Sequence, residues 1–174
     1  MNTANKLTML RVVMIPVFLL ALYIQFPFNN LVALAIFILA SVTDFIDGYI
    51  ARHFDQITDF GKFMDPLADK LLVTSAMLWF VEVGQMPAWA LLVVIAREFA
   101  VSGLRMVAAP KGIVIAAAWS GKIKTASTMV CICIMLLPIP DILNTICVAV
   151  ILVTTLVSGV EYFVKNRSVF SGAV

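Results

Sequence analysis

Apolar residues fill six stretches of the chain, which short polar or turn-forming segments separate. The stretches cover about residues 7–25, 31–52, 63–83, 87–109, 119–137 and 142–164. Each is close to the roughly 20 residues that an α-helix needs to cross the hydrocarbon core of a bilayer. Helix-breaking residues mark the gaps between them: Pro27, Gly84, Pro110 and Pro138. The pattern predicts an all-α integral membrane bundle of six transmembrane helices, forming a single domain over residues 1–174.

The composition supports a membrane protein and argues against nucleic acid as a partner. Hydrophobic residues make up 63% of the 174 residues and charged residues only 13%. A soluble domain has about 45–50% apolar and about 25% charged residues. The net charge of +2 is too small to indicate nucleic-acid binding. The first apolar stretch is not followed by a small-residue cleavage pattern, so we expect a retained helix rather than a signal peptide.

The positive charges are distributed asymmetrically over this six-segment plan. All twelve lysines and arginines lie near the first end, the second-to-third and fourth-to-fifth connections, or the end of the sixth segment. The opposite connections, near residues 26–30, 84–87 and 138–141, contain none. Because cytoplasmic loops of membrane proteins are enriched in lysine and arginine, we expect both termini on the cytoplasmic side.

Four aspartates gather on this same side. Asp44 and Asp47 are three residues apart near the end of the second segment, and Asp65 and Asp69 are four apart in the third. Residues at these spacings share one face of a helix. The short connection makes the two helices neighbours, so the four carboxylates can meet. Because carboxylates at membrane depth are costly, they indicate function.

Such a group of carboxylates requires either protonation or a cation between them. The ligand atoms are all oxygen, which favours Mg²⁺, Mn²⁺ or Ca²⁺ over zinc. A pair of these ions can bind a diphosphate and stabilise both the attacking and the leaving oxygen. Asp55 and Asp59 fall in the connection, where we expect them to be solvated.

Taken singly, some of these aspartates and the glycines near them could have a purely structural role. Asp65 precedes Pro66 and resembles a helix N-cap, and Asp69 could pair with a nearby lysine. Gly48 and Gly61 could serve helix packing as well as a bound ligand. None of these roles explains Asp44 and Asp47 within an otherwise apolar helix.

The spacing D-x2-D-G-x2-A-R-x8-G-x3-D-x3-D over residues 44–69 resembles the signature of the CDP-alcohol phosphotransferase family, and all eight fixed positions match. The resemblance implies six transmembrane helices and a homodimer in a bacterial cytoplasmic membrane, with the active site facing the cytoplasm. It also implies transfer of a phosphatidyl group from CDP-diacylglycerol to an alcohol, with release of CMP and the help of two Mg²⁺ or Mn²⁺ ions.

The resemblance assigns roles residue by residue. Asp44, Asp47 and Asp65 would bind metal, and Asp69 would be the general base that also touches the second metal. The donor CDP-diacylglycerol would contact a set of seven residues, of which the first two belong to a shorter N-terminal pattern, Asn5-x2-Thr8-x2-Arg11. These residues are Asn5, Thr8, Gly48, Ala51, Arg52, Thr58 and Gly61.

Two further segments, 95–105 and 121–125, resemble the bacterial branch of this family that uses sn-glycerol 3-phosphate as the acceptor. A phosphorylated acceptor requires cations, and Arg105, Lys122 and Lys124 lie near the expected cytoplasmic ends of the fourth and fifth segments. The alternative is that these cations, like Lys111, contact lipid headgroups.

Arg97 and Glu98 lie deeper in the fourth segment. Adjacent residues do not face each other on a helix, so the spacing leaves the partners of Arg97 and Glu98 unassigned. Glu98 is expected to form an ion pair with another helix, and Arg97 to support either the acceptor site or an aspartate.

Other functions fit parts of the pattern. The signature handles the donor, so another acceptor such as inositol phosphate, serine or a second phospholipid remains open. A divalent-cation transporter would also have intramembrane aspartates, although it would be expected to place polar groups at the midplane. A purely structural membrane subunit would tolerate replacement of Asp69. Cys131 and Cys133 point in nearly opposite directions on a helix, so neither a disulfide nor a metal pair is expected from them.

Overall fold

The computed structural model describes residues 3–24, 26–53, 59–112, 115–116 and 118–169. Within helices, the side chains of residues 3–6, 44–53, 59–63, 65–66 and 168 are also outside the description.

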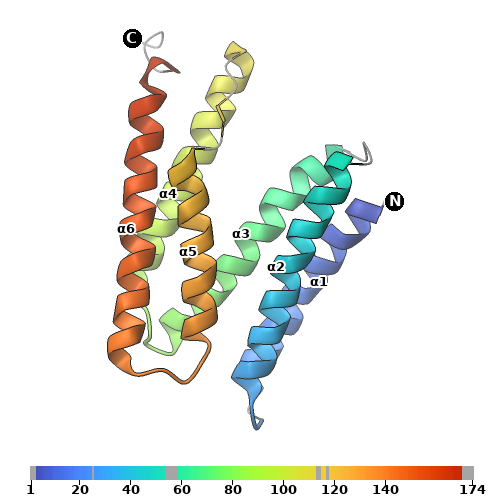
Figure 1. Ribbon diagram of the computed structural model, residues 1–174, viewed down its shortest axis with the longest axis vertical. Coiled ribbons are helices and arrows are strands. Elements are labelled where there is room, and N and C mark those ends of the chain that lie inside the picture. The colour runs from blue at the N-terminus through green and yellow to red at the C-terminus, as the bar shows by residue number, and fades with distance from the viewer. Residues whose placement is uncertain (1–2, 25, 54–58, 113–114, 117, 170–174) are drawn as a thin grey trace. The chain divides into compact units, whose positions relative to one another are not determined.

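The described residues form six α-helices and no strand, as the hydropathy pattern predicts (Figure 1). The helices are α1 (Thr3–Tyr23), α2 (Asn29–His53), α3 (Asp59–Glu82), α4 (Ala88–Ala108), α5 (Trp119–Met135) and α6 (Asp141–Lys165). Two short 3-10 helices, η1 (Ala109–Lys111) and η2 (Arg167–Val169), follow α4 and α6. One expectation was wrong: Asp59 is the first residue of α3 and does not lie in the connection, whereas Asp55 falls outside the described residues.

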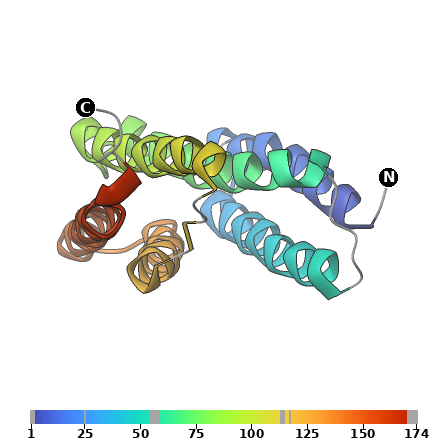
Figure 2. The same ribbon diagram turned by 90° about the horizontal axis from the view of Figure 1, so that it is seen from above.

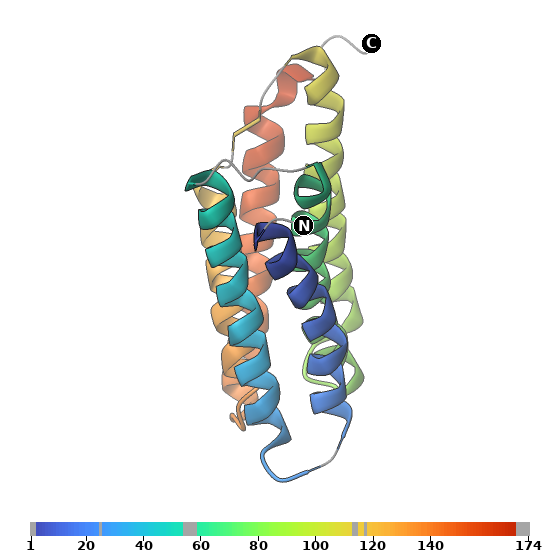
Figure 3. The same cartoon turned by 90° about the vertical axis from the view of Figure 1, so that its right-hand side faces the viewer.

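The chain divides into two compact units, residues 1–80 with 132–138 and residues 81–131 with 139–174. In the first unit α1 and α2 pack against each other along their lengths (Figure 3). Phe18 and Phe37 are both fully buried in this contact, with ring centroids 5.9 Å apart. Tyr23, at the end of α1, meets the ring of Trp79 of α3 edge-on at 4.9 Å. Aromatic pairs in these arrangements stabilise helix contacts beyond the area that they bury.

In the second unit α4 packs on α6, and Figure 2, which looks nearly along α5 and α6, shows α4 inclined to both. At the C-terminal ends of α4 and α6 a small core unites five buried residues: Val101, Leu104, Ala108, Tyr162 and Val169. Partly buried Ile115 and Ala118 from the α4–α5 connection pack on it. Because Val169 belongs to η2, the chain after α6 folds back onto the end of α4.

Hydrogen bonds to backbone oxygens fix both ends of the second unit. Asn144 Nδ2, in the first turn of α6, donates to the carbonyl oxygen of Gln85 at 2.6 Å. At the other end Lys111 Nζ donates to the carbonyl oxygen of Val169 at 2.6 Å. Gly84 and Gly112 adopt positive φ angles of 78° and 71°, which glycine accepts without steric cost, where the chain leaves α3 and η1.

Among the described residues, α6 alone is long and apolar enough to meet a strict test for a membrane-crossing helix. Shorter apolar helical stretches occur at Leu7–Tyr23 of α1 and Asn29–Thr43 of α2. The all-α, six-helix prediction is therefore confirmed. The crossing of a membrane by all six helices, and the side on which the termini lie, stay predictions.

Candidate active site

The four signature aspartates lie on α2 and α3, both in the first unit. Each helix is continuous through its pair, so Asp44 and Asp47 are one turn apart on α2, as are Asp65 and Asp69 on α3. Figure 3 shows that the end of α2 and the start of α3 lie at the same end of this unit. Asp69 is half-buried, whereas the side chains of Asp44, Asp47 and Asp65 are outside the description. The convergence of the four carboxylates therefore stays a prediction.

Only some of the residues expected to contact CDP-diacylglycerol have side chains that the structure describes. Thr8 and Arg11 are three residues apart on α1 and are both buried, with 1% and 0% of their surface exposed. Arg11 marks the first end of the six-segment plan and also completes the N-terminal pattern, but its full burial was not predicted. A guanidinium is rarely buried without a structural or functional reason, which favours a role for this N-terminal pattern. Six residues have no described side chain: Asn5, Gly48, Ala51, Arg52, Thr58 and Gly61.

The chemistry of the aspartate group suits a hard divalent cation. Its ligand atoms are carboxylate oxygens alone, which bind Mg²⁺ or Mn²⁺ in preference to softer metals. Among the side chains that the structure describes, no three His, Cys, Asp or Glu residues gather, but that set lacks three of the four aspartates. Of the site residues, Asp44, Asp47, Asp65 and Asp69 are the ones that could hold the metal.

A second group of charges lies in the second unit, and Glu98 of α4 is at its centre. The carboxylate oxygen Oε1 accepts hydrogen bonds from Lys124 Nζ of α5 at 2.6 Å and from Arg97 Nη1 at 3.0 Å. The side chains of Lys124 and Arg97 are only 7% and 11% exposed. The predicted interhelical ion pair of Glu98 is confirmed, and its partner is Lys124.

Residue spacing left the partners of Arg97 and Glu98 unassigned, and the structure shows that these two side chains pair. Adjacent Cα–Cβ bonds diverge on a helix, but the arginine side chain is long enough to curve back to its neighbour's carboxylate. Lys124, predicted to bind acceptor phosphate, instead directs its ammonium group at Glu98. This contact favours a role for Lys124 in holding α4 and α5 together.

Arg97 and Arg105 of α4 approach the same aromatic ring, that of Tyr162 on α6. The guanidinium carbon lies 5.7 Å from the ring centroid for Arg97 and 5.4 Å for Arg105. Arg105 Nη2 also donates a hydrogen bond to the Tyr162 hydroxyl. The sequence left the partner of Arg97 open and gave no role to Tyr162. The eight-residue spacing of Arg97 and Arg105 does predict that both lie on one face of α4, because residues eight apart recur on one face of a helix.

Gly159 of α6 gives Arg97 room to reach this ring. A Cβ atom at position 159 would lie 3.2 Å from Cγ of Arg97, closer than ordinary van der Waals contact. A Cβ at Gly121 of α5 would meet Tyr162 Cε2 at 3.7 Å and Arg97 Nη2 at 3.8 Å. Arg97 therefore extends between α5 and α6 where both helices lack a side chain.

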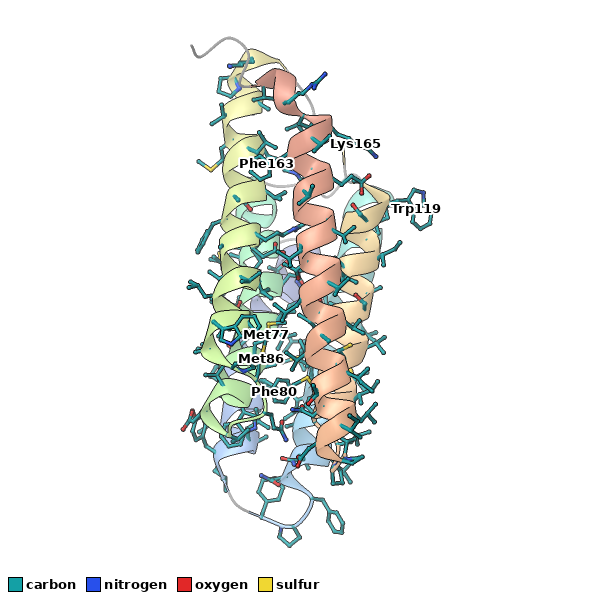
Figure 4. All side chains as sticks on the ribbon, turned by 90° about the vertical axis from the view of Figure 1, so that its left-hand side faces the viewer. Met77, Phe80, Met86, Trp119, Phe163 and Lys165 are labelled. Carbon is teal, nitrogen blue, oxygen red and sulfur yellow. The ribbon has the colours of Figure 1, made fainter. Side chains whose placement is uncertain are left out.

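Lys122 lies at the start of α5, with its Nζ 5.4 Å from the ring centroid of Trp119. Trp119, the first residue of α5, is 77% exposed and projects away from the helix (Figure 4). A lysine over an exposed tryptophan is typical of a cation at a polar boundary. Lys122, unlike Lys124, is exposed and makes no ion pair among the described residues.

Comparison with known proteins identifies the family. The model of the CDP-alcohol phosphatidyltransferase family matches residues 1–158. The chain therefore belongs to this family, as the signature in residues 44–69 predicts.

Curated relatives cover almost the whole chain. A CDP-diacylglycerol–glycerol-3-phosphate 3-phosphatidyltransferase of Bacillus subtilis is 42% identical over 187 residues, which cover 95% of each chain. A probable phosphatidylglycerophosphate synthase of Mycobacterium tuberculosis is 40% identical over 94% of this chain and 81% of its own. A CDP-diacylglycerol–glycerol-3-phosphate 3-phosphatidyltransferase of Rickettsia bellii is 35% identical over 97% of each chain.

The arrangement around Glu98 predicts that loss of the shared carboxylate lowers stability more than loss of one of its partners. Glu98→Gln leaves two buried cations without their shared carboxylate, and we expect it to lower the free energy of unfolding by about 2–3 kcal/mol. Lys124→Met leaves Glu98 paired with Arg97 and should cost about 1 kcal/mol or less. Thermal unfolding of the purified variants in detergent measures the difference.

Lys165→Met is the control, because Lys165 pairs with Glu161 on the exposed surface of α6 and such pairs contribute about 0–1 kcal/mol. If Lys124→Met lowered the free energy of unfolding more than Glu98→Gln does, the shared role of the Glu98 carboxylate would be contradicted.

Proposed function

We propose that this protein transfers the phosphatidyl group of CDP-diacylglycerol to sn-glycerol 3-phosphate, forming phosphatidylglycerol phosphate and releasing CMP. The observation that carries the proposal is the complete eight-position signature on α2 and α3. It occurs in a chain whose relatives, named for this reaction, match 95% or more of it at 35–42% identity. The protein is thus a transferase of phospholipid biosynthesis.

The donor is bound through residues of the first unit. Asp44, Asp47 and Asp65 would hold Mg²⁺ or Mn²⁺, and Asp69 would also bind the second ion. When bound, the metal would supply positive charge that neutralises the diphosphate and stabilises the leaving oxygen of CMP. Gly48, Ala51 and Gly61 leave room for the nucleotide beside the helix backbones, and Arg52, Thr58, Asn5 and Thr8 contact it. Buried Thr8 and Arg11 on α1 support this part of the proposal.

The chemical step is a displacement at the lipid-side phosphorus of CDP-diacylglycerol. The primary hydroxyl oxygen of the acceptor forms a bond to this phosphorus while the bond to the bridging oxygen of CMP breaks. Asp69 accepts the hydroxyl proton, and such general-base assistance is typically worth about 10²–10⁴-fold in rate. The half-buried position of Asp69 leaves its carboxylate accessible to a substrate.

The phosphate of the acceptor is bound by cations of the second unit. Arg105 offers a planar fork of N–H donors that matches phosphate, and Lys122 adds an exposed ammonium group. Arg97 joins them because its guanidinium shares the Tyr162 ring with Arg105. Lys124 contributes through Glu98, which orients Arg97.

The lipid substrate places the reaction in a bacterial cytoplasmic membrane. The acyl chains remain in the bilayer while cytidine and acceptor arrive from water, so the site opens to the cytoplasm. The twelve lysines and arginines on that side of the six-segment plan support this orientation. A homodimer is the expected assembly of this multi-pass protein.

The first test identifies the lipid product. Purified protein is incubated with CDP-diacylglycerol, Mg²⁺ and, in separate reactions, sn-glycerol 3-phosphate, inositol phosphate, serine and a phospholipid. We expect phosphatidylglycerol phosphate and stoichiometric CMP from the first acceptor alone, detected by mass spectrometry. Asp69→Asn should lower turnover by about 10²-fold or more, because the general base is lost.

Thermal unfolding provides the control that Asp69→Asn still folds. A lipid formed only from another acceptor would reject the acceptor assignment, and full activity of Asp69→Asn would reject the role of Asp69.

The second test concerns the acceptor phosphate. Arg105→Ala and Lys122→Ala should each raise the KM for sn-glycerol 3-phosphate by about ten-fold or more, because a charge-assisted hydrogen bond contributes about 1.5–3 kcal/mol. The KM for CDP-diacylglycerol should stay within about two-fold. Lys165→Ala, an exposed lysine of α6, is the control and should change neither constant. An unchanged acceptor KM in both variants would remove these residues from the phosphate site.

A further inference from the structure

Tyr162 is buried among the groups that the proposed function assigns to the acceptor phosphate. Only 2% of its surface is exposed, and its ring belongs to the core formed with Val101, Leu104, Ala108 and Val169. That core joins α4, α6 and η2, so the ring has little freedom to move. The two guanidinium groups of Arg97 and Arg105 nevertheless lie within 5.7 Å of its centroid.

The hydroxyl of Tyr162 donates one hydrogen bond and accepts another. It donates its one proton to the carbonyl oxygen of Ala116 at 3.1 Å, in the α4–α5 connection. Its oxygen accepts a hydrogen bond from Nη2 of Arg105. A phenolic hydroxyl has one donor and can accept as well, so the bond to Ala116 turns an oxygen lone pair towards Arg105. The direction of the Arg105 guanidinium is therefore tied to the position of the connection.

Two guanidinium groups near one ring repel each other, and the structure offsets that repulsion. The negative face of an aromatic ring attracts cations, and Glu98 accepts a hydrogen bond from Arg97 at 3.0 Å. The Nε atom of Arg97 is buried and has no hydrogen-bond partner among the described residues. An oxyanion brought to this place would satisfy that donor and neutralise the excess positive charge.

We propose that Tyr162 is a positioning residue for the acceptor phosphate, holding Arg97 and Arg105 in the arrangement that binds it. The inference rests on the proposed function, and it assigns Tyr162 no contact with the substrate. Long arginine side chains lose much rotamer freedom on binding, and prior ordering by a rigid partner strengthens the complex. Tyr162 supplies that order through its ring for both arginines and through its hydroxyl for Arg105.

Tyr162→Phe tests the proposal, because it retains the ring and its packing while removing the acceptor of the Arg105 hydrogen bond. We expect the KM for sn-glycerol 3-phosphate to rise about five- to ten-fold, as loss of one hydrogen bond to a charged group predicts. The KM for CDP-diacylglycerol and kcat should stay within about two-fold. Because KM does not depend on the fraction of enzyme that is folded, partial unfolding cannot produce this result.

Tyr23→Phe is the matched control, since it makes the same change in the first unit, beside Trp79 of α3. It should leave both KM values unaltered. A double variant then separates positioning from direct contact. If Tyr162 acts through Arg105, adding Tyr162→Phe to Arg105→Ala should raise the acceptor KM by less than about two-fold further.

The inference is overturned if Tyr162→Phe leaves the acceptor KM unchanged, lowers kcat alone, or acts with its full effect in the Arg105→Ala background. These results would leave the proposed function in place, provided that Arg105→Ala itself raises the acceptor KM. If Arg105→Ala has no effect, both the phosphate assignment and the inference fail. If the wild-type protein does not form phosphatidylglycerol phosphate, the proposed function fails before any variant is compared.

Discussion

The cost of placing a charged group in apolar surroundings governs this molecule. Only 13% of its residues are charged, and each charge on a helix needs a partner, an aqueous boundary or a ligand. Where side chains are described, the structure shows charged groups that are paired with one another. Lys165 and Glu161 pair on the exposed surface of α6, and buried Lys124 and Arg97 share Glu98. Nε of Arg97 is buried without a hydrogen-bond partner among the described residues, and this donor is one that the proposed acceptor phosphate would satisfy.

This constraint divides the proposed chemistry between two sets of residues. In the proposed function the acidic set on α2 and α3 of the first unit would serve the diphosphate donor, which requires cations between carboxylates and phosphates. Arg97, Arg105 and Lys122, the basic set of the second unit, would serve the acceptor phosphate. Tyr162 connects the basic set to the fold, because its ring packs in the core at the ends of α4 and α6 while its hydroxyl contacts Arg105 and Ala116.

Hydropathy was sufficient to predict the six helices, because segment length and turn residues determine them almost independently of packing. The prediction that Asp44 and Asp47 share a face depended only on helical spacing, and the continuity of α2 supports it. The interhelical ion pair of Glu98 was predicted, but its partners were not. The contact of Arg97 with Glu98 depends on how far a flexible side chain curves, and that of Lys124 with Glu98 depends on the register of α5 against α4. Neither quantity can be obtained from residue spacing within one helix.

The central claim is that the aspartates of α2 and α3 together hold divalent cations, and binding of Mn²⁺ followed by electron paramagnetic resonance tests it most directly. Addition of the wild-type protein should diminish the six-line signal of free Mn²⁺. Asp44→Asn with Asp47→Asn should largely abolish this effect, while Glu161→Gln, at an exposed ion pair of α6, should not. Equal Mn²⁺ binding by wild type and the double aspartate variant would contradict the account, because the four carboxylates would then have no common ligand.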